Sequence, residues 1–387
     1  MTTNNKKQLI WHIGDPKTGS TSIQRAFATQ SVDAGDRTVE CFRPHGTHTN
    51  SVAPARALKK KNPKGVARWF RKINDWANES QANYLVVSAE TFGNVRPRLI
   101  KNAMQKYLTD YADTAKVISY IRPHASRFLA AYTQRTKMGV AYDSYNDLIV
   151  GIQRQKALFY APRVSRWGSA FGDHYTLRPF VRSELRENDV VQDFFHEIFG
   201  DDSFTIKNKI EANTGLSTHA LMGVKFFHQY LKDADVSNKA RKTLARCLYQ
   251  YHIPKAETSR PRPVLDKGTL ETLYETYHED AQAVDNKFFD HPLMFDALEK
   301  ARAEAPEEPT DFSLNTHYSE DEQNQLKILF RDIVKLQAGH EKLWLSYLNF
   351  TKKLIQLSEP QLSLLKDNKA TVDEMDGLLA EVASIFQ

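Results

Sequence analysis

The sequence lacks several features that would narrow its class at once. Its 387 residues include two cysteines, Cys41 and Cys247, which allow at most one disulfide and have no spacing typical of a metal site. No apolar run approaches the ~18 residues that a membrane-spanning helix needs. The apolar stretch near the start is too short for the core of a signal peptide. We therefore expect a globular protein of a reducing compartment, the cytoplasm.

Charge is distributed unevenly along the chain. The net charge is +6, yet residues 301–387 hold 9 Lys and Arg against 15 Asp and Glu. Residues 1–300 hold 44 against 32 and are strongly basic. A basic body suits an anionic ligand such as a nucleotide, an acidic glycan or a nucleic acid, although part of the excess is ordinary solvated surface.

Apolar runs and helical patterns alternate over the first half of the chain. Runs that read as buried strands lie at residues 9–13, 83–90, 115–123 and 174–180. Helical patterns lie at 20–30, 126–139, 161–172 and 189–200. This alternation predicts an α/β fold with a parallel sheet flanked by helices, whose ligands bind at the carboxyl ends of the strands. Gly14, Glu90 and Arg122 lie at or just past those ends.

The pattern changes near residue 204, after which helical stretches follow without clear strands. The predicted boundaries are 1–303 for the α/β domain (core 8–200, helical part 204–303), 304–312 for a Pro- and Glu-rich linker and 313–387 for a helical tail. The apolar stripe of the tail has to be buried. We expect this C-terminal helical extension to pack on the body or to form a homo-oligomer, with no part in the chemistry.

The stretch HIGDPKTGSTS, residues 12–22, looks like a phosphate loop between a strand and a helix. Gly14 and Gly19 keep the glycine spacing of nucleoside triphosphatases, but the lysine is Lys17, inside the loop. Backbone amides of residues 18–22 can hold a phosphate at the helix N-terminus. Further hydroxyl donors are Ser20, Thr21 and Ser22. No strand ending in Asp is apparent where Mg²⁺ would need it. The alternative is a glycine-rich turn without a ligand.

A second pattern, RPHASRFLAAYTQ at residues 122–134, follows the third strand. Together with DPKTGSTS it resembles sulfotransferases that use 3′-phosphoadenosine 5′-phosphosulfate (PAPS), especially bacterial sulfotransferase-like proteins related in pattern to carbohydrate sulfotransferases. Positions that match the second family signature are Arg122, Arg127, Tyr132 and Gln134. The family serine falls at Ala130, with Ser126 as its nearest substitute. The resemblance covers about residues 8–200 and continues weakly to about 300.

This resemblance implies a P-loop-type enzyme that moves a sulfuryl group from PAPS to a hydroxyl or amine of a carbohydrate or other small acceptor, without a metal. Lys17 would neutralise charge on the bridging oxygen, and Arg122 would bind the 3′-phosphate. The product would be adenosine 3′,5′-bisphosphate. Expected cofactor-binding residues are Pro16, Lys17, Thr18, Gly19, Ser20, Thr21, Ser22, Arg122, Ser126 and Arg178.

Lys17 is the first expected catalytic residue. The acceptor also needs a general base, for which two further residues are candidates. Glu90 is the first, and its alternative role is an ion pair with a loop lysine or arginine. His48 is the second, with His45 weaker, and either can instead be a solvent-facing loop histidine. Arg178 resembles part of a family segment, but it can equally form a structural ion pair.

Residues 55–72 carry a run of basic residues with Trp69 and Phe70 among them. This run could hold an anionic acceptor by charge and ring stacking, although such runs are often solvated helix faces. It shows no nucleic-acid motif, so we expect no nucleic-acid partner. Two further classes stay open. One is a nucleotide-binding, kinase-like P-loop protein. The other is a non-catalytic binding module that keeps the fold, supported only by Ala130.

Overall fold

The computed structural model describes residues 7–44, 49–140, 142–207, 215–253, 260–352 and 357–387. They form two compact units, each assembled from separate stretches of the chain. The first unit comprises Met1–His124, Phe159–Ala212 and Tyr277–Leu298, and the second comprises Ala125–Leu158, Asn213–Thr276 and Glu299–Gln387. The units alternate along the chain, whereas the sequence suggested consecutive domains.

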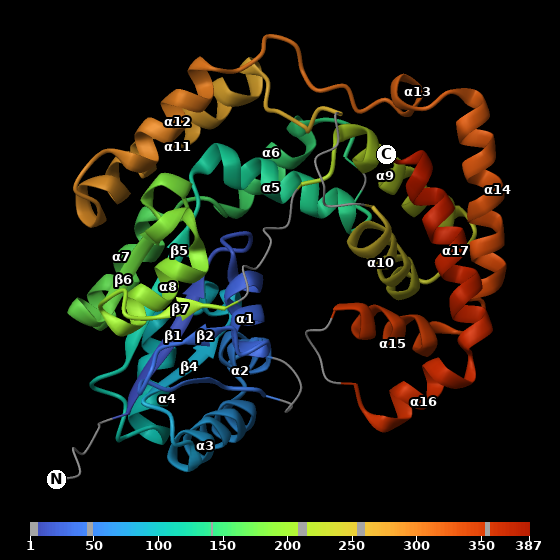
Figure 1. The fold of residues 1–387 in the computed structure, drawn as a ribbon. Helices are drawn as coiled ribbons and strands as arrows, with labels where there is room; N and C mark the ends of the chain where they lie inside the picture. Colours follow the sequence, from blue (N-terminus) through green and yellow to red (C-terminus); the bar gives the residue numbers. More distant parts are fainter. Residues whose placement is uncertain (1–6, 45–48, 141, 208–214, 254–259, 353–356) are drawn as a thin grey trace. The chain divides into compact units, whose positions relative to one another are not determined.

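The first unit is built on a five-stranded parallel sheet in the order β3-β4-β1-β5-β6 (Figure 1). Its strands are β1 Gln8–Gly14, β3 Val39–Cys41, β4 Tyr84–Ser88, β5 Lys116–Ile121 and β6 Tyr175–Pro179. Central strand β1 pairs with β4 up to His12↔Ser88 and with β5 up to Gly14↔Tyr120. Parallel pairing brings the carboxyl ends of these three strands to one edge. The α/β class and parallel sheet are therefore confirmed.

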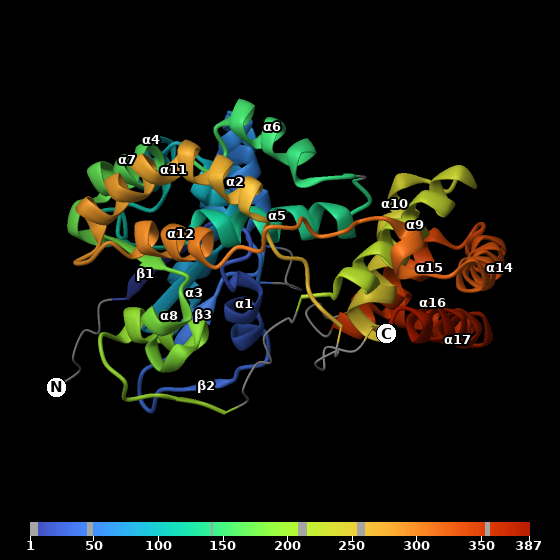
Figure 2. The same ribbon diagram turned by 90° about the horizontal axis from the view of Figure 1, so that it is seen from above.

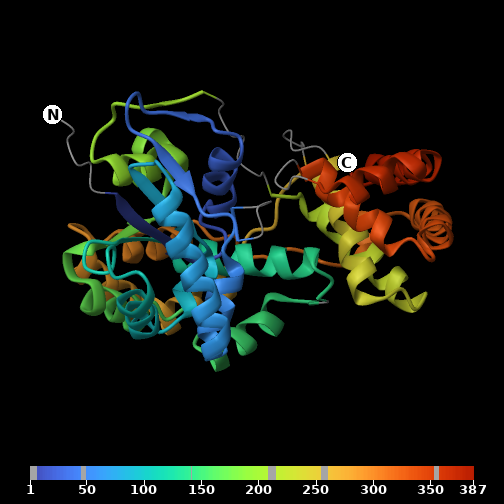
Figure 3. The ribbon, with the colours of Figure 1, turned by 90° about the horizontal axis from the view of Figure 1, so that it is seen from below.

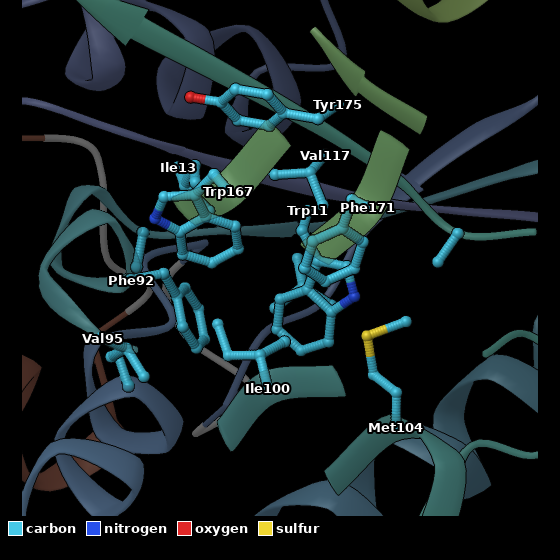
Figure 4. Close-up of a cluster of buried hydrophobic side chains, with 14 of the residues drawn as sticks. Trp11, Ile13, Phe92, Val95, Ile100, Met104, Val117, Trp167, Phe171 and Tyr175 are labelled. Carbon is cyan, nitrogen blue, oxygen red and sulfur yellow. The ribbon is translucent and has the colours of Figure 1, made fainter. Parts of the chain in front are cut away.

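Alternation along β1 supplies a core on each face of the sheet. Leu9, Trp11 and Ile13 belong to one buried cluster, while Ile10 belongs to the other. Figure 4 shows the first cluster, where Phe92 packs edge-on against Trp11 with ring centroids 5.0 Å apart.

Helices of the first unit cover both sheet faces (Figure 2). The cluster around Trp11 includes residues of α2 Val52–Lys59, α3 Pro63–Glu79, α4 Pro97–Tyr107 and α7 Ala161–Phe171, the end of α11 Lys267–Phe288 and the start of α12 Leu293–Ala303. The opposite cluster includes residues of α1 Ser20–Ala28 and α8 Val190–Phe199. Short 3₁₀ turns are η1 Glu90–Asn94, η2 Gly172–His174, η3 Arg182–Glu184 and η4 Arg186–Asn188.

A small antiparallel pair stands apart from the main sheet. It joins β2 Val32–Asp33 to β7 Thr205–Ile206. The sequence suggested no clear strand after about residue 204, and this expectation is wrong because β7 follows that position. Two residues per strand give too little alternation for a sequence pattern to show.

The second unit is helical within its described residues. Its elements include most of α5 His124–Lys137, with α6 Tyr145–Gln155, α9 Thr218–Asp233, α10 Asn238–Cys247, η5 Leu248–His252, α13 Leu314–His317, α14 Glu320–Gln337, α15 Glu341–Lys352, α16 Glu359–Asp367 and α17 Lys369–Ile385. Figure 3 shows the olive α9 and α10 beside the orange and red helices of the tail. The predicted C-terminal helical region is confirmed.

The tail buries its apolar stripe within this unit. Helix α14 contacts α9 and α17, and Phe330 lies 4.8 Å from Phe227 between ring centroids. Leu326, Leu329 and Ile333 are buried, while Ile328 is exposed. Packing of α14 on α9 and on α17 of the same chain thus buries these three residues of the stripe. None of the helices in the described ranges has both the length and the apolar character needed to cross a membrane.

Candidate functional site

Two glycines bound the loop that joins β1 to α1. Gly14 has φ 139°, and a Cβ there would lie 2.6 Å from the carbonyl oxygen of Tyr120 on β5. Gly19 has φ 79°, and a Cβ there would lie 2.6 Å from Cγ1 of Val190. Any side chain at either position would clash and would also strain the backbone. The glycine spacing seen in the sequence is therefore a packing requirement of this strand–loop–helix unit.

Asp15 anchors the loop. Its amide donates to the carbonyl of Tyr120 at 2.9 Å, and its own carbonyl accepts from the Thr18 hydroxyl at 2.7 Å. Its Oδ1 accepts from Nη1 of Arg163 on α7 at 2.5 Å. Burial acts to lower the pKa of the Arg163 guanidinium, but pairing with Asp15 outweighs it and raises that pKa. This ion pair was not foreseen, because 148 residues separate its partners.

Backbone donors without partners collect where α1 begins. Within the described residues, the amides of Thr18, Gly19, Ser20 and Thr21 donate no hydrogen bond. The amide of Ser22 is different, because it donates to the carbonyl of Gly19 at 2.9 Å. Free amides in the first turn of a helix favour an anion, as the positive end of the helix dipole also does. These donors fit a phosphate group.

Two predicted cations border the same loop. Lys17 has φ 70°, a left-handed conformation uncommon for a residue with a Cβ, and its side chain is exposed. Arg122 follows β5, and its Nη1 donates to the carbonyl of Lys17 at 3.3 Å. The Arg122 guanidinium lies 5.7 Å from the ring centroid of Phe180. The structure therefore brings Lys17 and Arg122 together, as the two motifs suggested.

Glu90 brings a carboxylate to the loop. It opens η1 directly after β4, and its Oε2 accepts a hydrogen bond from the hydroxyl of Ser20 at 3.0 Å. Gly93 packs tightly on the loop, because a Cβ there would lie 2.7 Å from the carbonyl oxygen of Gly14. Glu90 therefore supplies a carboxylate beside the hydroxyl of Ser20, at the strand end where the sequence suggested it would lie.

Arg178 makes structural contacts. Its guanidinium forms an ion pair with the buried Asp193 of α8, and its Nη2 donates to the carbonyl of Glu184 at 2.9 Å. The hydroxyl of Tyr120 donates to the same Asp193 at 2.6 Å. These bonds tie β6 and β5 to α8, so Arg178 performs the structural alternative considered for it. A cofactor contact by Arg178 stays a prediction.

Four other predicted positions either belong to the second compact unit or lie outside the described residues. His45 and His48 lie outside the described residues. Ser126 and Ala130 lie on α5 in the second compact unit, where both are half-buried. The described candidate site therefore consists of the loop, Glu90, Arg122 and Arg163.

A buried polar group beneath the loop was missed in the sequence. His12 on β1 is buried, with Nδ1 2.8 Å from the hydroxyl oxygen of Ser88. Nε2 of Gln24 donates to the same oxygen at 3.1 Å. Burial lowers the pKa of His12 to about 3, so the ring is neutral and has a structural role. The signal was available as a histidine inside an otherwise apolar strand.

The basic run at residues 55–72 does not offer its rings to a ligand. Trp69 and Phe70 on α3 are buried, and Phe70 stacks on Trp11 with ring centroids 5.7 Å apart. The suggestion that these rings stack on a glycan is therefore wrong. Lys60 and Lys64 in this run are exposed, as expected of a solvated helix face.

No family model, curated protein or solved structure matches this chain. The resemblance to PAPS-dependent sulfotransferases therefore rests on the motifs themselves.

Proposed function

We propose that the protein is a PAPS-dependent sulfotransferase with a P-loop-type site, acting on a hydroxyl or amine of a carbohydrate or other small acceptor. The observation that carries this proposal is the hydrogen bond between Glu90 and Ser20, next to four unpartnered amides. A carboxylate weakens anion binding by repulsion, so a loop that only held an anion would gain nothing from it. A transferase needs such a group to accept the proton of the attacking acceptor.

PAPS fits the donors of this site. When bound, it supplies a sulfuryl group joined to a phosphate leaving group. The amides from Thr18 to Thr21 would hold that phosphate, and Lys17 would offset negative charge that develops on it. Arg122 would hold the 3′-phosphate by a charge-assisted bond. The Arg163–Asp15 pair would hold the loop in this conformation without touching PAPS.

A transfer assay tests the proposal. Radiolabelled PAPS is offered with glycans, lipids and phenols to the wild type and to Glu90→Gln, which keeps the size of the side chain but removes its basicity. We expect wild-type transfer to at least one acceptor class. In the variant, turnover should fall by about 10²–10⁴-fold, the usual contribution of a general base. Equal turnover in both proteins would contradict the role of Glu90.

A kinase-like nucleotide-binding function is the second candidate, and the same hydrogen bond favours it. A serine hydroxyl and a carboxylate on the neighbouring strand can hold the Mg²⁺ of a bound triphosphate in P-loop enzymes. The position of Lys17 inside the loop argues against this candidate. In a kinase-like protein, Mg²⁺ would raise the affinity for ADP, and Glu90→Gln would abolish this increase. A sulfotransferase would bind adenosine 3′,5′-bisphosphate equally well in EDTA.

A cytoplasmic setting belongs to the same proposal. Its support is that Cys41 and Cys247 are both free and buried thiols. Burial raises the pKa of Cys41 to about 12, which keeps it an unreactive thiol.

A further inference from the structure

A cavity of about 1070 Å³ opens between the start of α4 and α7, within the first unit. Its lining includes five cationic side chains and no carboxylate: Arg96, Arg98, Lys101, Arg163 and Arg166. Val95 and Trp167 also line it and belong to the buried cluster in Figure 4. The cavity, named here the α4–α7 pocket, thus combines cationic walls with two residues of the apolar core.

The charges of the α4–α7 pocket are largely uncompensated. Arg96, Arg98 and Arg166 are exposed and take part in no ion pair within the described ranges. Lys101 donates to a backbone carbonyl of α7, that of Ala170, at 2.7 Å. Arg163 uses Nη1 for Asp15, and its Nη2 is buried with no hydrogen-bond partner in the described chain. Like charges gathered in one concavity repel one another, and a bound anion relieves that repulsion.

The pocket adjoins the proposed reaction site. Arg163 contacts the loop through Asp15, and Gly93 contacts it at Gly14. Glu90 begins the 3₁₀ turn that ends in the pocket wall, three residues before Gly93. At ~2 Å per residue, the candidate base therefore starts roughly 6 Å along the turn from that wall. A molecule in the pocket would therefore lie near the turn that begins at Glu90.

We propose that the α4–α7 pocket binds anionic groups of the acceptor, so that the acceptor carries sulfate or carboxylate groups besides the hydroxyl it offers. This inference rests on the proposed sulfuryl transfer. Guanidinium groups match the planar geometry of carboxylates and the oxygens of sulfates, often through two parallel hydrogen bonds. The volume is of the order that small-molecule sites occupy, ~300–1,000 Å³. A neutral acceptor would leave these cations unused.

Calorimetry on the full chain tests the pocket with sucrose octasulfate as the probe and sucrose as the neutral control. The pocket variant is Arg98→Gln/Arg166→Gln, which changes two exposed, unpaired cations. The matched control is Lys60→Gln/Lys64→Gln, which removes the same charge from the basic run. We expect sucrose not to bind. The probe should bind the pocket variant at least about tenfold more weakly than the wild type, a loss of ~1.4 kcal/mol in binding free energy. Its affinity for the control variant should stay within about twofold of the wild-type value.

Three outcomes would overturn the inference. The probe does not bind the wild type, the two variants weaken it equally, or saturating adenosine 3′,5′-bisphosphate displaces it. Displacement would place the probe in the loop instead of the pocket. Binding of the bisphosphate itself to the pocket variant should stay at the wild-type level. If the bisphosphate binds neither the wild type nor the variants, the proposed sulfotransferase function is contradicted. Binding of the probe then still tests the pocket independently.

Discussion

The hydroxyl of Ser20 donates a hydrogen bond of 3.0 Å to Oε2 of Glu90, a residue 70 positions further along the chain. The contact exists because β1 and β4 are parallel neighbours whose carboxyl ends meet at one edge. It places a carboxylate beside the free backbone amides at the start of α1. Transfer of an acyl, phosphoryl or sulfuryl group to a hydroxyl requires both a site that binds an anion and a base close to it.

Replacing Lys17 by alanine should lower turnover by at least roughly 10²-fold, because it removes charge stabilisation present mainly in the transition state. Affinity for adenosine 3′,5′-bisphosphate should fall much less. Steady-state kinetics and calorimetry measure the two effects. Lys64→Ala, at an exposed site on α3, is the matched control and should leave both unchanged. Near-native turnover in Lys17→Ala would mean that the loop does not serve sulfuryl transfer.

Replacing Arg122 by alanine should weaken binding of adenosine 3′,5′-bisphosphate by about 2–4 kcal/mol, since a dianion loses a charge-assisted partner. Adenosine 5′-phosphosulfate lacks the 3′-phosphate and serves as the control ligand. Its affinity should change little. Equal losses for both ligands would place Arg122 somewhere other than the 3′-phosphate site.

Breaking the Arg163–Asp15 pair should destabilise the protein. The two side chains are only 16% and 5% exposed, so Arg163→Met leaves a carboxylate buried without its cation. We expect a loss of about 3–5 kcal/mol in the free energy of unfolding. Arg163→Met/Asp15→Asn should lose less than the sum of the single changes. Urea unfolding measures all three, and strict additivity would show that the pair does not act as a unit.

His12 should make the protein sensitive to mild acid. Its pKa is about 3 in the folded state against an ordinary 6.5, because burial disfavours the charged ring. Above pH 6.5 the group is neutral in both states and has no effect. As the pH falls from 6.5 towards 3, only the unfolded chain takes up this proton, so stability falls by up to ~1.4 kcal/mol per pH unit.

The matching measurement is urea unfolding at pH 6.5 and 4.5 for the wild type, His12→Asn and the control His174→Asn, whose histidine is exposed. His12→Asn should lose less stability between these pH values than the wild type, by about 2 kcal/mol. The control should follow the wild type. Parallel behaviour of all three proteins would show that His12 is not the source of the acid sensitivity.

Strand ends were predictable from the sequence. Buried parallel strands read as continuous apolar runs, so β1, β4 and β5 stop where Gly14, Glu90 and Arg122 begin the polar edge. The edge strand β3 was missed, because Val39–Cys41 is too short to form such a run. Burial of Trp69 could have been foreseen: Trp69, Phe70, Ile73 and Ala77 lie on one helical face of α3.

Contacts between distant stretches could not be predicted in the same way. No sequence pattern links Arg163 to Asp15. The cations of the α4–α7 pocket come from two segments of the chain that are separated by β5, α5 and α6. The alternation of the two compact units along the chain is likewise a property of tertiary packing. Local periodicity records which face of an element is buried, but not what buries it.

The most direct test of sulfuryl transfer is calorimetry of the wild-type chain with adenosine 3′,5′-bisphosphate and with ADP, each with and without Mg²⁺. Our account predicts that the bisphosphate binds at least about tenfold more tightly than ADP, a difference of ~1.4 kcal/mol, and that EDTA leaves its affinity unchanged. Preference for ADP in the presence of Mg²⁺ would contradict the account in favour of a kinase-like protein. Binding of neither nucleotide would contradict it in favour of a non-catalytic module.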